Sequence, residues 1–115
     1  MATYSKVSLS GSTNGAGILV AATTTPGTII HTAGAGTSGF DEVWIYCQNT
    51  STSAVPLDVE YGGTATKDLI EITIQPESGL VLIAPGLFLN NGLVVRAFAG
   101  TTNVLSIHGY VNRVS

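Results

Sequence analysis

The segment Gly34–Gly39 has the residue types of a phosphate-binding loop. It reads Gly-Ala-Gly-Thr-Ser-Gly, a G-x-G-x-x-G pattern of the kind that cradles a dinucleotide pyrophosphate. That chemistry requires a helix directly after the glycines, because the helix N-terminus meets the phosphates. Residues 40–46 follow here, Phe-Asp-Glu-Val-Trp-Ile-Tyr, and their pattern is typical of a strand. We therefore interpret Gly34–Gly39 as a flexible loop between strands and expect no cofactor.

The histidines and the cysteine are the next candidates for chemistry. His31 and His108 each fall in a predicted strand, with no Cys, His or carboxylate at ligand spacing. Since zinc sites use three or four such ligands, we expect two ordinary strand histidines and no metal. Cys47 is the only cysteine, so it cannot form an intramolecular disulfide. Its place in the apolar run 43–47 predicts a small core residue.

Carboxylate pairs could perform glycoside hydrolysis if two of them faced each other across a cleft. Asp58, Glu60 and Glu71 fall on the polar phase of alternating segments, where solvent-facing acids belong. No G-x-S-x-G or S-x-x-K nucleophile motif occurs in the sequence. We therefore predict that the protein is not an enzyme.

Calcium is the other chemistry that carboxylates could support. Asp41, Glu42 and Asp68 could offer oxygen ligands, but no D-x-D-x-D loop is present. We expect no calcium site.

Aromatic side chains could stack on a sugar or a base. The candidates are Trp44, Tyr46, Tyr61, Phe98 and Tyr110, each in a predicted strand. Because each lies in a strand, we expect them to pack in the core. Stacking on an exposed site is the alternative.

The elements that would position these residues are short β-branched segments separated by turn residues. The predicted strands are 6–10, 18–23, 28–32, 42–48, 55–61, 69–75, 80–83, 87–89, 93–99 and 104–111. Within them, Ile70, Ile72 and Ile74 should point inward. Pro85-Gly86 should interrupt a strand, and Asn91-Gly92 should form a hairpin turn. We predict an all-β fold, a two-sheet antiparallel, jelly-roll-like β-sandwich of 8–10 short strands.

The 115 residues form one predicted domain, 1–115, of which 1–10 are either an extended N-terminal arm or the first strand. Only 10% of residues are charged, against about 25% in ordinary soluble domains. A surface poor in charge is either a neutral, Thr-rich β surface or, in the interpretation we favour, one that packs against other proteins. The net charge of −3 and the four scattered basic residues argue against nucleic-acid binding. We expect no signal peptide and no membrane span.

Three stretches together resemble a known family. They are residues 4–15 with 17–21, the central Phe40–Tyr46, and residues 91–100 with 107–113, which contain the runs Val-Val-Arg-Ala-Phe-Ala and Ile-His-Gly-Tyr-Val-Asn-Arg. They are similar to small capsid decoration, or cement, proteins of tailed bacteriophages, by overall pattern and not by a diagnostic motif. The resemblance implies a β-sandwich, commonly a homotrimer, that binds the major capsid protein on the outer surface of the head. It implies a location in the virion after synthesis in the host cytoplasm.

Our hypothesis from the sequence is a structural virion protein that stabilises an icosahedral phage head. We expect capsid or subunit contacts at Thr3, Tyr4 and Lys6, because the first segment could add as a strand to a neighbouring sheet edge. The alternatives are a carbohydrate-binding β-sandwich module, or another virion component such as a head spike, a fibre or a tail part.

Overall fold

The computed structural model describes residues 3–115, and it is a sandwich of two antiparallel sheets. The strands are β1 (Tyr4–Ser8), β2 (Ile18–Leu19), β3 (Thr28–Thr32), β4 (Phe40–Asn49), β5 (Val55–Tyr61), β6 (Leu69–Ile74), β7 (Val81–Leu89), β8 (Val94–Ala99) and β9 (Leu105–Val114). A short 3-10 turn, Thr66–Asp68, precedes β6. The predicted all-β sandwich is confirmed.

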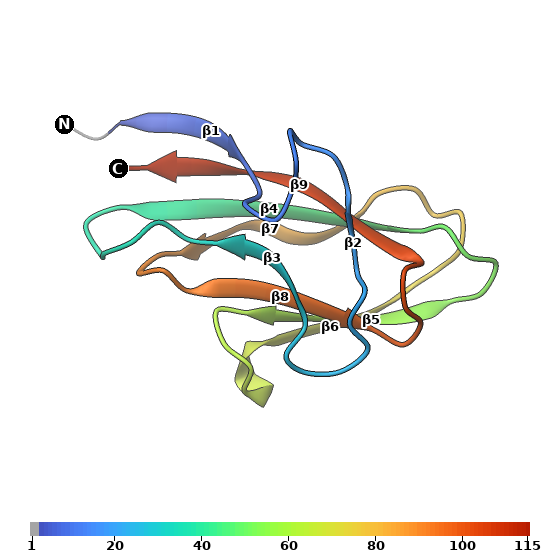
Figure 1. The fold of residues 1–115 in the computed structure, drawn as a ribbon. Coiled ribbons are helices and arrows are strands. Elements are labelled where there is room, and N and C mark those ends of the chain that lie inside the picture. The colour runs from blue at the N-terminus through green and yellow to red at the C-terminus, as the bar shows by residue number, and fades with distance from the viewer. Residues whose placement is uncertain (1–2) are drawn as a thin grey trace.

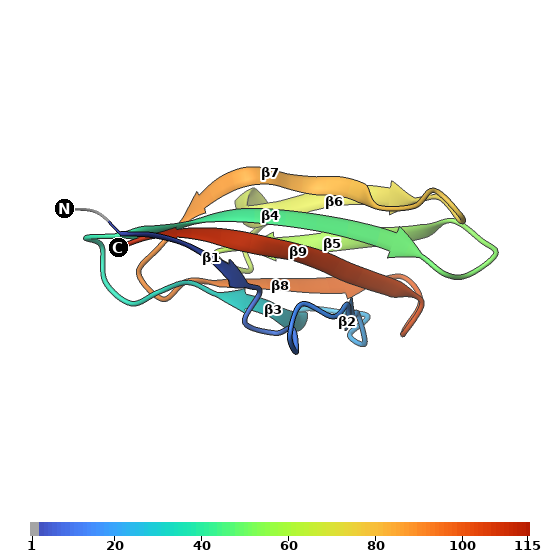
Figure 2. The same ribbon diagram turned by 90° about the horizontal axis from the view of Figure 1, so that it is seen from above.

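The two sheets have the connectivity of a jelly roll. Sheet A has the order β1-β9-β4-β7, with β2 also paired to β9, and sheet B has the order β3-β8-β5-β6. Consecutive strands alternate between the sheets from β3 to β5 and again from β6 to β9. Figures 1 and 2 show the two layers, with the start of β1 beside the end of β9 at one end of the sandwich. Packing two sheets in this way is one of the arrangements by which all-β proteins limit their exposed sheet edges.

The core between the sheets is aliphatic. Its large, fully buried side chains include Leu9, Ile30, Ile45, Leu57 and Ile107. No aromatic residue belongs to the buried set among residues 3–115. The expectation that the strand aromatics pack in the core holds only for Tyr61, which is partly buried against it, and is wrong for Trp44, Tyr46, Phe98 and Tyr110. Cys47, in contrast, is completely buried as predicted.

Two predicted breaks behave differently in the structure. Pro85 and Gly86 lie within β7, where register shifts against β4 absorb them, because β7 is an edge strand. Asn91 and Gly92 have φ values of 58° and 69°, so the turn conformation is correct. The turn nevertheless carries the chain from β7 in sheet A to β8 in sheet B, and it is not a hairpin.

Strand β6 lies at the edge of sheet B and is only partly covered. The cross-strand register places Ile70, Ile72 and Ile74 on the core side, opposite buried residues of β5, so their predicted phase is correct. Ile74 is fully buried, but Ile72 is 36% exposed because no strand lies beyond β6.

Glu60 of β5 is the clearest departure from the predicted pattern. It lies on the polar phase, as expected, but it is 1% exposed and does not face solvent. Its carboxylate accepts hydrogen bonds from the Thr25 hydroxyl and from the Gly27 backbone N–H, both at 2.6 Å. The 25–27 loop therefore covers this position, and the two donors compensate the burial of the carboxylate.

Candidate functional site

The outer side of sheet A gathers most of the aromatic residues. On β4, Val43 and Ile45 point into the core, so the residues that alternate with them point outward. The strand register places outward residues of β1, β7 and β9 beside these outward residues of β4. Six of the eight aromatic residues lie on this side. We call it the aromatic face, and its members are Tyr4, Phe40, Trp44, Tyr46, Phe88 and Tyr110.

Rings on the aromatic face pack against one another and not against the core. Phe40 and Phe88 stack with centroids 4.7 Å apart, and Trp44 and Tyr110 lie 6.2 Å apart with nearly parallel planes. Tyr4 is 77% exposed and Phe88 60% exposed. Aromatic area of this kind is what protein-binding surfaces use as anchors.

Gly86 makes room for the Trp44 ring. A Cβ at Gly86 would lie 2.9 Å from Cζ2 of Trp44, and its φ of 75° is in the left-handed region. A side chain here would therefore both strain the backbone and displace the indole.

Two charged groups lie among the rings. The Lys6 ammonium sits 4.3 Å from the centroid of the Tyr110 ring, in a cation–π contact. Glu42 accepts hydrogen bonds at Oε1 from the Trp44 indole N–H, at 2.7 Å, and from the Asn112 amide, at 3.0 Å. These donors hold the pKa of Glu42 below its ordinary value, so it is ionised at neutral pH.

The residues expected from the sequence at the contact are only partly brought together. Tyr4 and Lys6 share the outer side of β1, and both line a shallow depression with Phe40, Glu42 and Asn112. Thr3 precedes β1 and joins the end of the chain instead, through two backbone hydrogen bonds with Ser115. Residues 1 and 2 of the predicted N-terminal segment lie outside the described residues.

The outer side of sheet B has a different character. Asp58 and Glu71 are directly opposed on β5 and β6, and Arg96 lies on the same side on β8. Burial, followed by the hydrogen bond and the negative charge of Glu71, raises the pKa of Asp58 to about 6. The acidic side of the sandwich is thus turned away from the aromatic face.

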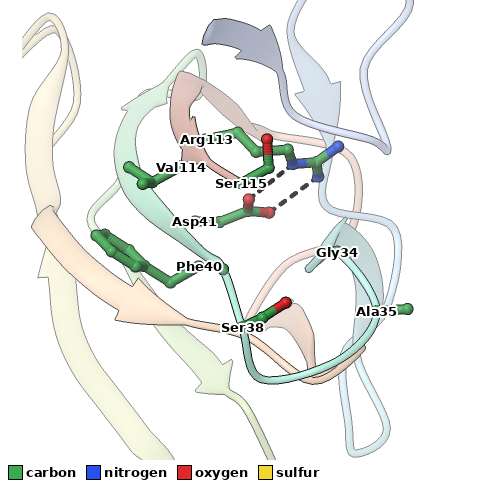
Figure 3. Close-up of a pocket in the computed structure, with 9 residues that line it drawn as sticks. Gly34, Ala35, Ser38, Phe40, Asp41, Arg113, Val114 and Ser115 are labelled. Atoms are coloured by element: carbon green, nitrogen blue, oxygen red, sulfur yellow. Dashed lines mark hydrogen bonds and ion pairs between the residues drawn. The ribbon is translucent and has the colours of Figure 1, made fainter. Parts of the chain in front are cut away.

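A second candidate lies beside the glycine-rich loop, in a small cavity lined by the loop, Asp41 and Arg113 (Figure 3). Arg113 Nε donates to Asp41 Oδ1 at 2.8 Å, and Arg113 Nη2 lies 3.0 Å from Oδ2. His31 reaches the same Oδ2 from the opposite sheet, with its Nε2 at 2.7 Å. The Ser10 backbone N–H donates to His31 Nδ1, so the ring carries its proton on Nε2.

This cluster joins the two sheets. Burial alone would raise the pKa of Asp41, but the hydrogen bonds from Arg113 and His31 outweigh it and lower the pKa. Both carboxylate oxygens and both ring nitrogens already have partners within the protein. The arrangement therefore suits a structural bridge better than a reactive centre.

The glycine-rich loop also has a structural role. Strand β4 follows it, as predicted, so the context of a dinucleotide site is not present at this loop. The carbonyls of Gly34 and Gly36 accept backbone hydrogen bonds from Gly92 and Asn91. The loop thus holds the connection between β7 and β8 at the end of the sandwich.

The acids considered for calcium do not converge. Asp41 points into the interior and Glu42 onto the aromatic face, because they are neighbours on one strand. Asp68 is paired with Lys67 at 2.8 Å. Within residues 3–115, no group of three or more potential metal ligands is found.

Comparison with protein-family models, with curated proteins and with solved structures gave no match. In the described part of the chain, no helix has the length and hydrophobicity needed to span a membrane.

Proposed function

We propose that this protein is a structural virion protein, a decoration protein that binds the outer surface of an icosahedral phage head and stabilises it. The observation that carries the proposal is the aromatic face: a broad, shallow sheet surface with six aromatic rings and two charged side chains. Apolar patches bordered by polar residues are often functional contacts.

The shape of the face favours a protein partner. It covers the four main strands of sheet A, and the depression at its edge contains neither Trp44 nor Tyr110. A flat, aromatic and charge-poor surface matches the core of a protein interface. On a shell, each copy would bridge neighbouring capsid subunits and shift the equilibrium away from the ruptured state, because it binds only the assembled one.

Co-sedimentation with mature shells tests this function. We expect the purified protein to pellet with intact shells at a fixed ratio to the capsid protein, and not to bind isolated capsid subunits. Phe88→Asp should weaken binding, because it replaces an exposed aromatic ring of the apolar contact with a charge. Ile29→Asp is the matched control, since Ile29 is 49% exposed on the outer side of sheet B. The proposal fails if the protein stays in the supernatant, or if both variants bind like the parent.

A carbohydrate-binding module is the second candidate. The nearly parallel Trp44 and Tyr110 rings favour it, because an aromatic surface can stack on the apolar side of a sugar ring. Titration with soluble oligosaccharides, followed by tryptophan fluorescence, separates the two functions. A saturable change that Tyr110→Ala abolishes, without any shell binding, would favour the carbohydrate module.

A further inference from the structure

The aromatic face carries one anion and one cation that have no ionic partner in the described part of the chain. The ion pairs of residues 3–115 are His31–Asp41, Lys67–Asp68 and Arg113–Asp41. Glu42 uses Oε1 for both of its hydrogen bonds, and Oε2 receives none from these residues. The Lys6 ammonium lies over the Tyr110 ring in a cation–π contact, which does not neutralise its charge. A partner that covers this face must supply opposite charges to both groups, or bury them unpaired at a cost.

The two charges are symmetrically placed about one strand. Lys6 on β1 is opposite Asn112 on β9, and Asn112 is opposite Glu42 on β4. Neighbouring strands are about 4.8 Å apart, so each charged residue lies one strand spacing from Asn112, on opposite sides of it. Rotation by half a turn about an axis along β9 exchanges these two positions.

We infer that, in the free protein, a second copy of this chain covers the aromatic face. The two-fold axis runs parallel to β9, in the plane between the two copies, and passes over Asn112. Lys6 of each copy then faces Glu42 of the other, so both charges are paired twice in one interface. The inference rests on the proposed function only in treating the aromatic face as a protein-docking surface. A two-fold interface uses the same surface on both copies, which this charge arrangement permits.

The half-turn superimposes β1, β9 and β4 of the two copies and leaves β7 of each copy outside the contact. These three strands have five, ten and ten residues. At about 3.3 Å per residue and about 4.8 Å per strand, they present roughly 400 Å². Stable interfaces bury about 800 Å² per partner, so we expect a weak dimer, and shell binding competes with its formation.

The proposed dimer differs from the homotrimer that the family resemblance implies. A closed trimer needs two different surfaces on each copy, whereas the aromatic face is a single surface that pairs with itself.

Sedimentation equilibrium of the purified chain and of two charge variants tests the inference. We expect a dimer for the parent, and at least about a tenfold weaker dimer for Lys6→Glu and for Glu42→Lys, because each change creates two like-charge contacts. An equimolar mixture of the two variants should recover the dimer, since both contacts are then between opposite charges. The chain with both changes should also dimerise by itself.

Lys67→Glu and Glu77→Lys are the matched controls. They change the net charge by the same amounts at exposed positions away from the face, and they should leave the dimer unchanged. Urea unfolding of each variant shows whether Glu42→Lys folds. If it does not, Lys6→Glu combined with Glu42→Gln supplies the comparison, because it should dimerise better than Lys6→Glu alone.

A monomeric or trimeric parent would overturn the dimer, and so would variants that dimerise like the parent or a mixture that does not recover. Shell binding by a monomeric parent overturns the dimer alone. A dimer that fails to bind shells overturns the proposed function and leaves the dimer intact.

Discussion

The buried carboxylate of Asp41 depends on Arg113, and removal of Arg113 should destabilise the fold strongly at neutral pH. Asp41 is 1% exposed, and Arg113 supplies the only hydrogen bond to its Oδ1 among the described residues. Breaking a buried ion pair from one side costs about 3–5 kcal/mol. The Arg113 side chain is 34% exposed, so water screens part of the pair. We therefore expect Arg113→Leu to lower the free energy of unfolding by about 2–3 kcal/mol at pH 7.

The cost should depend on pH in a defined direction. The lowered pKa of Asp41 in the parent adds stability that is present above the unfolded pKa of about 4 and is lost as the pH falls through the folded pKa. Without Arg113, only the His31 contacts oppose the effect of burial, so the pKa of Asp41 rises and the variant gains less stability from the ionised carboxylate as the pH rises. The difference between parent and variant must therefore grow from pH 4 to pH 7.

Urea unfolding at pH 4 and at pH 7 measures this difference. Adding Asp41→Asn to Arg113→Leu should recover part of the loss at pH 7, because no unpaired charge remains. Arg96→Leu is the control, since Arg96 forms no ion pair among residues 3–115. A loss below about 0.5 kcal/mol for Arg113→Leu, the range of ordinary surface changes, would refute the reasoning. So would a loss of equal size at both pH values.

Four further predictions test other parts of the structure. Asp58→Asn should stabilise the protein by up to about 1 kcal/mol at pH 7 and hardly at pH 4. The pKa of Asp58 is raised to about 6 in the folded protein, so the parent loses stability as the pH rises from about 4 to about 6. Thermal melts at both pH values measure this difference. Ile74→Ala should cost about 2–5 kcal/mol and Ile72→Ala less than about 1.5 kcal/mol in urea unfolding, since only Ile74 is fully buried; equal costs would contradict the assignment of β6 as an edge. Glu60→Ala should increase proteolysis within the 25–27 loop, because both hydrogen bonds that hold it are lost, and an unchanged digest would argue against this anchor. Cys47 should resist thiol reagents until the protein unfolds, since burial raises its pKa to about 12, and rapid labelling of the folded protein would contradict that burial.

Strand alternation predicted the fold well, because a residue's phase follows directly from the period of a strand. Segments 28–32 and 55–61 are strands with the bounds predicted. The path of the chain between sheets was not accessible in the same way. Positive φ at Asn91 and Gly92 identifies a turn, but it does not determine whether the next strand pairs with the previous one or crosses to the other sheet.

The sequence shows that the aromatic residues of β4 share one phase, but not which phase is buried. Phe40, Trp44 and Tyr46 share one phase of β4, while Val43 and Ile45 occupy the other. Either set could form the core, and aromatic residues are the usual choice by type. The aliphatic set is buried because the facing residues of sheet B are aliphatic too, which is a property of the assembled sandwich.

The bridge of His31, Asp41 and Arg113 had no signal in the sequence. His31 and Asp41 are 10 residues apart, and Asp41 and Arg113 are 72 apart. Three strands from two sheets bring them together, so only the topology reveals the contact.

A cryo-electron microscopy map of decorated heads tests the proposed function most directly. We predict one set of β-sandwich densities at fixed lattice positions on the outside of the shell, each with the outer side of sheet A against capsid protein. Trp44 and Phe88 should be buried in that contact, and the acidic side of sheet B should face solvent. Heads without such density, or density with the aromatic face directed to solvent, would contradict the account.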